Sequence, residues 1–193
     1  MNRRRALSAA ACLLMGLGLW QAGSGGYIHA KAWLAQGLID DAWVRVQAGE
    51  ERARPWPWAD TWPVARLELP RLNAAMTVLA GGSGRTMAFG PGHVDGSVMP
   101  GEAGISLIAG HRDTHFRLLE ALRLGDDIRI EDRAGGHHNF RVTSLQIIDS
   151  RRVRIDPYAE TPRLALSTCY PFDALTTGGP LRYVVFADAV GGP

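Results

Sequence analysis

The chain has 193 residues, of which 46% are hydrophobic and 21% are charged, and its formal net charge is +2 at pH 7. This length and composition are typical of one globular domain with an additional segment. Because positive and negative charges nearly balance, the sequence gives no electrostatic case for a nucleic-acid partner, and we expect none.

The first residues have the pattern of an export signal. Three arginines, Arg3 to Arg5, precede an apolar run from Ala6 to Trp20, which predicts a cytoplasmic N-terminus and a periplasmic body. A membrane-spanning helix needs about 20 apolar residues, whereas the small side chains of Ala22 and Ser24 would also suit a signal peptidase. Residues 1–24 are therefore interpreted as an uncleaved signal-anchor in the inner (cytoplasmic) membrane, with a cleaved signal as the alternative.

The second segment, residues 25–61, is predicted to be an amphipathic helix followed by a linker. Apolar residues recur near helical spacing from Ala30 to Gln47, so this stretch is expected to pack on the domain or lie on the lipid surface. The stretch from Ala53 to Pro63 is rich in proline and tryptophan, which excludes a helix or a central strand there.

Residues 62–193 have the pattern of short strands divided by turns. The predicted strands cover residues 64–70, 74–80, 104–111, 127–132, 139–148, 163–169 and 181–189. Residues 81–97 are rich in turn-forming residues, and residues 116–126 suit about two helical turns. About eight short strands in this length indicate a mostly β domain with short helices, either a closed barrel or a sandwich.

Only one of the two cysteines lies in this domain. Cys12 is inside the N-terminal apolar run, whereas Cys169 ends a predicted strand, so the two are not expected to form a disulfide. A lone cysteine in an exported domain indicates either a reactive thiol or a small buried core residue. The count alone leaves both interpretations open.

A reactive cysteine needs a neighbouring base or cation, because the thiolate is the nucleophile. Among the histidines His111 is best placed, since it follows an apolar strand and Gly110 directly. Arg182 opens the last predicted strand. A fixed cation there could stabilise an oxyanion, although an ordinary charge at a strand edge is the simpler interpretation from the residues alone.

Three features taken together resemble the sortases, which are membrane-anchored cysteine transpeptidases built on an eight-stranded β-barrel. The family's cysteine motif, Thr-Leu-any-Thr-Cys, is matched by residues 165–169 except that Ala165 replaces the first threonine. The family's histidine falls on His111 and its arginine on Arg182. The resemblance covers residues 62–189, and the segments before it are most similar to the sortases of Gram-negative proteobacteria.

The resemblance implies a closed eight-stranded sortase-type β-barrel and a transpeptidase mechanism. Cys169 would attack a sorting signal similar to Leu-Pro-any-Thr-Gly (LPxTG) at the C-terminus of an exported substrate protein, and a thioester would form. His111 would protonate the leaving amine and then activate an incoming amine, which the sequence does not identify. Arg182 would hold the oxyanion or the substrate backbone, and Thr168 and Ser167 would contact the sorting motif.

Three alternatives come from the residues themselves. A cysteine L,D-transpeptidase also combines cysteine with histidine, but its Ser-His-Gly motif does not occur before the cysteine of this sequence. His111 and His115 have the spacing of a zinc-binding pair, although Arg112 stands where that motif has its glutamate. The domain could also be a non-catalytic periplasmic binding or scaffold module.

No cofactor is expected, and no acidic cluster predicts a calcium site. The variable positions of the sorting signal are expected to depend on the loops at residues 88–100 and 148–158.

Overall fold

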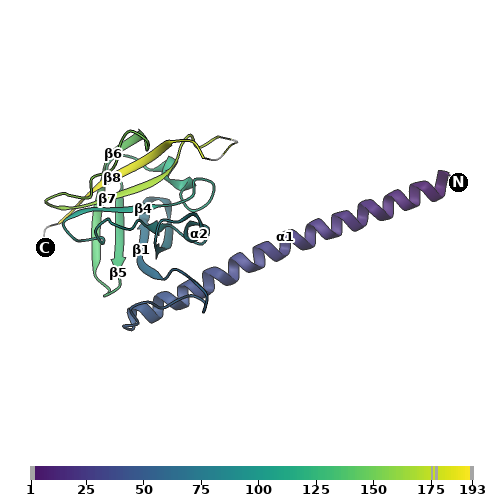
Figure 1. Ribbon diagram of the computed structural model, residues 1–193, viewed down its shortest axis with the longest axis horizontal. Helices are drawn as coiled ribbons and strands as arrows, with labels where there is room; N and C mark the ends of the chain where they lie inside the picture. Colours follow the sequence, from purple (N-terminus) through teal and green to yellow (C-terminus); the bar gives the residue numbers. More distant parts are fainter. Residues whose placement is uncertain (1–2, 175, 177, 192–193) are drawn as a thin grey trace. The chain divides into compact units, whose positions relative to one another are not determined.

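The computed structural model describes residues 3–174, 176 and 178–191. Within them eight strands close into a barrel in the order β1-β2-β3-β4-β7-β8-β6-β5 (Figure 1). The strands are β1 (Pro63–Leu69), β2 (Ala74–Ala80), β3 (Gly92–His93), β4 (Gly104–Ala109), β5 (Asp127–Asp132), β6 (His137–Asp149), β7 (Pro162–Cys169) and β8 (Leu181–Ala189). The closed order confirms the eight-stranded barrel and excludes the sandwich.

A single long helix, α1 (Arg3–Gln47), takes the place of the two helical segments predicted from the sequence. The glycines at residues 23, 25 and 26 do not interrupt it, because a glycine weakens a helix by about 1 kcal/mol but keeps its backbone donor, unlike proline. The chain divides into two compact units between Gly37 and Leu38.

None of the helices in the described part of the chain is both long enough and apolar enough to cross a membrane. The spanning helix expected over residues 1–24 therefore finds no support in the structure, and the first two residues of that segment lie outside the described range.

The barrel interior is filled by apolar side chains from alternate strand positions. On β7, for example, Leu164 and Leu166 are fully buried, and they pack with Ile108 of β4 and Val185 of β8. Full burial of one such side chain contributes about 1.5–3 kcal/mol, so this interior supplies much of the driving force for folding.

Two elements occur inside the stretch that was predicted as turn. The short helix α2 (Gly84–Met87) begins where the Ser83 hydroxyl accepts a hydrogen bond from the Thr86 amide. Strand β3 has only two residues and forms by pairing with both β2 and β4. A strand this short carries no alternating pattern, so only its neighbours define it.

The remaining short helices are 3₁₀ turns: η1 (Pro70–Leu72) and η2 (Arg117–Ala121). The second replaces the two helical turns predicted for residues 116–126. The Pro/Trp-rich stretch is irregular, as predicted, and Trp56 packs edge-on against Phe89 with 4.9 Å between ring centroids.

The order of β4, β7 and β8 places the ends of distant segments together. β4 and β7 are parallel neighbours whose last residue pair is Ala109 with Ser167. Because parallel strands end at the same edge, the residues that follow Ala109 lie beside the end of β7. β8 runs antiparallel to β7, so its first residues meet the same edge.

Candidate active site

The three strands β4, β7 and β8 present two different faces. Paired residues share a face, and successive residues alternate between faces. The inner face belongs to the barrel interior. The other face, called the outer face here, carries Leu107 and Ala109 of β4, Ala165, Ser167 and Cys169 of β7, and Arg182 and Val184 of β8. The predicted cysteine and arginine therefore share one surface.

Cys169 and Arg182 are directly opposite each other across β7 and β8. Residues in this relation have their Cβ atoms about 4.5–5.5 Å apart. The Cys169 side chain is partly exposed. The Arg182 guanidinium is tied to the neighbouring loop, because its Nη1 donates to the carbonyl oxygens of Gly179 at 2.6 Å and Leu181 at 2.9 Å. These two bonds fix the Arg182 guanidinium at the start of β8, in the residue paired with Cys169.

His111 lies just beyond the end of β4, two residues past the pair that ends the β4–β7 ladder. The amide of Gly110 donates to the Ser167 carbonyl at 3.1 Å, and the amide of Phe116 returns to the His111 carbonyl at 3.1 Å. A Cβ on Gly110 would lie 2.7 Å from the ring of Phe116, so glycine is required for this close turn. The structure thus brings His111 to the same edge as Cys169.

The imidazole of His111 has a defined partner. Its Nε2 lies 3.3 Å from the carbonyl oxygen of Gly84, at the start of α2. Since a carbonyl oxygen only accepts hydrogen bonds, Nε2 carries the hydrogen in this contact. In a neutral ring Nδ1 is then the basic nitrogen.

Thr168 and Ser167 have different surroundings. Thr168 is only 2% exposed, and its hydroxyl donates to the carbonyl of Gly110 at 2.8 Å. This bond ties the end of β7 to the end of β4. Ser167 is partly exposed and shares the outer face with Cys169. The substrate contacts expected of both residues stay predictions, but Thr168 has a structural contact as well.

The sequence reasoning missed the part that Arg112 plays in this edge. Arg112 is 5% exposed and donates to the carbonyl oxygens of Pro171 and Ala174, which follow Cys169 in the chain. A buried arginine is rare unless it is paired. No local sequence pattern around Arg112 predicts its burial. The sequence alone therefore gave no signal for its contacts with the loop after Cys169.

The zinc-type spacing of His111 and His115 does not occur on a helix, because residues 112–116 form a turn. Burial lowers the pKa of His115, and a positive charge on His111 lowers it further. Across the described residues, no group of three or more metal-ligand side chains comes together.

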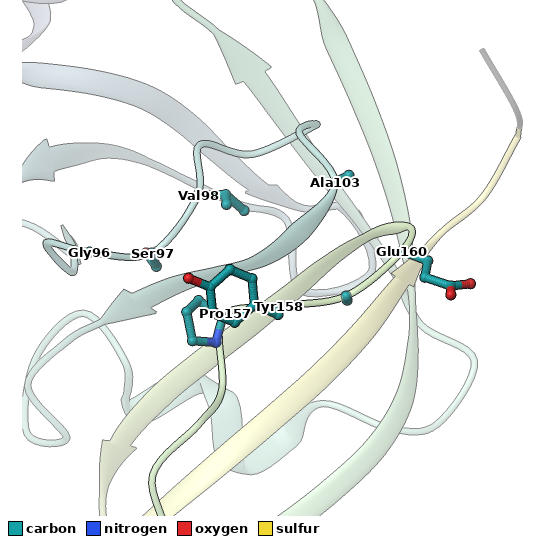
Figure 2. Close-up of a pocket in the computed structure, with 8 residues that line it drawn as sticks. Gly96, Ser97, Val98, Ala103, Pro157, Tyr158 and Glu160 are labelled. Atoms are coloured by element: carbon teal, nitrogen blue, oxygen red, sulfur yellow. The ribbon is translucent and has the colours of Figure 1, made fainter.

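A pocket of about 690 Å³ lies at the other end of the outer face, beside the starts of β4 and β7. Figure 2 shows Val98 on one wall and Tyr158 on the facing loop. The connection between β6 and β7 also covers part of the outer face, since Ile155 and Ala159 pack against the cluster around Ala165. Ser97, which lines the pocket, accepts a hydrogen bond from the amide of Leu107, and Leu107 pairs with Ala165. Because Ala165 is four residues before Cys169, this side of the pocket is about 13 Å from Cys169 along β7.

Comparison with known proteins agrees with this architecture. A family model described as the sortase domain matches residues 67–190. The chain belongs to the sortase family. This confirms the family that residues 165–169, His111 and Arg182 indicated, and it weighs against the L,D-transpeptidase alternative.

Several sortases are similar to this chain. Sortase D of Bacillus subtilis (strain 168) is 32% identical over 125 residues, which span 64% of this chain and 62% of that protein. A Clostridium perfringens Sortase D5 transpeptidase has a TM-score of 0.66 at 19% identity, covering 82% of this chain and 99% of that structure. Sortase A from Corynebacterium diphtheriae has a TM-score of 0.61 at 24% identity, covering 70% of this chain and 64% of that structure. At these identities the two structures show a shared fold.

Proposed function

We propose that this sortase is a cysteine transpeptidase that cleaves a C-terminal LPxTG-like sorting signal and transfers the substrate to an amine. The observation that supports the proposal is the meeting of three groups at one edge. Cys169 is partly exposed and directly opposite Arg182, and His111 follows the strand that runs parallel to β7. A nucleophile, an acid–base group and a fixed cation are the parts that acyl transfer to an amine requires.

The proposed reaction has two halves. The Cys169 thiolate attacks the threonine carbonyl carbon of the signal, and the oxyanion that forms is stabilised by the Arg182 guanidinium. The carbon–nitrogen bond to glycine then breaks as protonated His111 gives its proton to the leaving amine. In the second half an incoming amine attacks the thioester, neutral His111 removes the amine's proton, and the Cys169 thiolate leaves.

The outer face suits an extended peptide. Leu107 and Ala109 give it an apolar floor beside Ser167, and they are partly exposed. An extended peptide of about five residues spans about 17 Å, which is comparable to the length of β4. We propose that the part of the signal upstream of the cleaved bond runs toward the pocket at Val98 and Tyr158 (Figure 2). Those residues come from the two loops expected to select the motif.

We further propose that the substrate is an exported protein and that the enzyme is of the proteobacterial type, attached to the inner membrane and working in the periplasm. The support is the sequence pattern of Arg3 to Arg5 followed by apolar residues. In the structure Leu13 and Leu14 are 75% and 71% exposed, and large apolar side chains gain free energy by leaving water. Immunoblotting of the membrane fraction for a C-terminal tag tests this placement. A shortened soluble product would contradict the anchor.

The first test of the activity is Cys169→Ala. Purified enzyme is incubated with a fluorescent peptide containing Leu-Pro-Ala-Thr-Gly and with triglycine as the amine. We expect wild-type protein to gain the mass of the acyl group and to transfer it. The variant should lose transfer by on the order of 10³-fold or more, because it lacks the nucleophile.

The matched control is Cys12→Ala, which removes the other thiol of the chain and should leave transfer unchanged. Transfer by Cys169→Ala at the wild-type rate would exclude this mechanism. A Cys169 that does not react with a mild thiol label in the folded protein would instead favour the non-catalytic scaffold.

A further inference from the structure

The connection between β7 and β8 is held by arginines of the segment that follows His111. Arg112 Nη1 donates to the carbonyl oxygen of Pro171 at 2.8 Å, and its Nη2 donates to that of Ala174 at 3.0 Å. Arg117 donates to the carbonyl of Phe172, which lies between them. Three backbone carbonyls just after the cysteine are therefore fixed by side chains from one neighbouring segment.

Arg112 uses four of its five guanidinium N–H groups in hydrogen bonds. Besides the two carbonyls, its Nε and Nη2 donate to the two carboxylate oxygens of Asp113 at 2.7 and 3.1 Å. Its side chain is only 5% exposed, so few of its donors can turn to water instead. A lysine has a single nitrogen and cannot reproduce this fork, although it keeps the charge.

The Arg112 guanidinium lies near the thiol in the fold, because it donates to the carbonyl of Pro171, two residues after Cys169. The hydrogen bond that Arg112 donates to Asp113 is the largest cause of the raised pKa of Arg112. The negative charges of Asp113, of the Cys169 thiolate and of Asp173 raise that pKa further. The Arg112 charge and the Cys169 sulfur therefore lie within electrostatic range of each other.

The loop after Cys169 also has contacts that it would keep without Arg112. Phe172 is buried in the barrel core and packs edge-on against Tyr183 with 5.1 Å between ring centroids. The amide of Tyr170 donates to Leu181 at 3.0 Å. Removal of Arg112 should thus loosen the loop without unfolding the barrel.

We infer that Arg112 is a positioning residue for the proposed transpeptidase. It joins the segment carrying His111 to the loop that follows Cys169, so that imidazole and sulfur keep one relative placement. It also fixes a positive charge near the sulfur. Because it is buried and four of its five N–H groups are already bonded, it acts through these two groups and does not bind the substrate. The inference rests on the proposed function for its catalytic consequence, but its structural part does not need a substrate.

The kinetic test compares Arg112→Met, which removes the charge and the fork, with Arg112→Lys, which removes the fork alone. Misplacing a reacting group by about 1 Å can cost about 100-fold in rate. We expect kcat to fall by about that factor in the methionine variant and by less in the lysine variant, with KM within about threefold of wild type. Arg141→Met is the matched control, because Arg141 makes a comparable pair with Asp127 at 2.9 Å but is exposed.

Two further readouts need no sorting peptide. The first is the ratio of the Cys169 alkylation rates with iodoacetate, an anion, and iodoacetamide, which is neutral. This ratio should fall severalfold in Arg112→Met and stay near wild type in Arg112→Lys, since the nearby positive charge attracts the anion. The second is hydrogen exchange of the Phe172, Asp173 and Ala174 amides. It should become about tenfold faster in both variants.

These readouts distinguish a failure of the proposed function from a failure of the inference about Arg112. If wild-type protein does not transfer the peptide, the proposed function fails, while the alkylation ratio and the exchange rates still test the placement of Arg112. The inference is overturned if both variants keep wild-type loop exchange and alkylation ratio, or if the loss of activity appears in KM alone. Should Arg112→Met fail to fold, as judged by thermal melting, the lysine variant still tests the fork.

Discussion

Neighbouring residues of β7 have two different surroundings. Leu164 and Leu166 are fully buried in the barrel interior, whereas Ser167 and Cys169, one or a few positions away, are partly exposed on the outer face. The same alternation holds on β4, where Ile108 is buried and Leu107 is partly exposed. One ladder of strands therefore combines a largely buried inner face with an outer face that is buried around Ala165 and Val184 and partly exposed at its Cys169 end.

Substitutions on the two faces should therefore have separable effects on the free energy of unfolding and on the activity. Changes on the inner face should lower the free energy of unfolding and spare the activity of each folded molecule. Changes at the exposed end of the outer face, where Cys169 and Arg182 lie, should lower activity and leave the free energy of unfolding nearly unchanged. Thr168, which ties the end of β7 to the end of β4, should show a small part of both effects.

After the nucleophile Cys169 itself, the largest expected effect on the outer face is at Arg182. Loss of one donor to a developing oxyanion typically costs about 10²–10³-fold in kcat. Arg182→Gln is therefore expected to lower kcat by about this factor while leaving the melting temperature nearly unchanged. The measurement combines single-turnover transfer of the LPxTG peptide with thermal unfolding.

Arg163→Gln is the matched control for this prediction. Arg163 is on the same face of the sheet but at the far end of β7, where it pairs with Asp188 at 2.6 Å. Its replacement should change kcat by less than about threefold, because it is distant from the developing charge. Equal losses of kcat from the two substitutions would contradict a specific role for Arg182. They would show that the loss of either arginine on this face lowers the rate.

Much of this arrangement could be predicted from the sequence. The alternation in residues 163–169 and 181–189 located β7 and β8. Strand-end positions alone left Cys169 and Arg182 open to structural interpretations, and only the resemblance to the sortases assigned them roles. Strand β3 could not be found, because two residues have no period. The burial of Arg112 could not be found either, since it depends on carbonyl groups 59 and 62 residues away in the chain.

The N-terminal region shows another limit of the sequence patterns. The apolar run from Ala6 to Trp20 and the amphipathic pattern from Ala30 to Gln47 predicted two separate helical segments, but α1 continues from Arg3 to Gln47. Helix propensity is a small quantity per residue, so glycine weakens a helix without fixing where it ends. Proline and tryptophan in residues 53–63 were a stronger signal, because proline removes a backbone donor.

The next largest effect is expected from substitutions of two leucines, one on each face. Leu166→Ala should lower the free energy of unfolding by about 2–5 kcal/mol, since it leaves a cavity in a fully buried site. Transfer per folded molecule should then stay within about threefold of wild type. Leu107→Ala, on the partly exposed floor of the outer face, should cost less than about 1.5 kcal/mol and raise KM for the peptide.

Urea unfolding and initial-rate kinetics on the same preparations measure both quantities. The proposed difference between the two leucines would be contradicted if Leu107→Ala destabilised the protein as much as Leu166→Ala and left KM unchanged. In that case the outer face would be a second core at this position and not a peptide floor.

A smaller effect is expected at Thr168, which ties the end of β7 to the end of β4. Thr168→Val keeps the shape of the side chain but removes the hydroxyl that donates to Gly110. Leaving a buried carbonyl without its donor costs about 1–3 kcal/mol. Because Gly110 precedes His111, we also expect a modest decrease in kcat. Thr168→Ser retains the hydroxyl and should recover most of both losses, whereas a serine variant as impaired as the valine variant would contradict a role that rests on the hydroxyl alone.

The smallest expected effect concerns the acid sensitivity of the connection that covers the outer face. Asp149 ends β6, and hydrogen bonds from the Arg151 side chain and then its amide lower the pKa of this carboxyl from 3.8 to about 2. A lowered folded-state pKa means that the stabilisation is present above the unfolded value of about 3.9 and is lost as pH falls toward 2. Asp149→Asn should therefore melt slightly below wild type at pH 6 and together with it near pH 2. Arg151 is 70% exposed, so solvent screening keeps this difference small. A difference that persisted at pH 2 would mean that the substitution acts through packing of the connection, and not through the charge of Asp149.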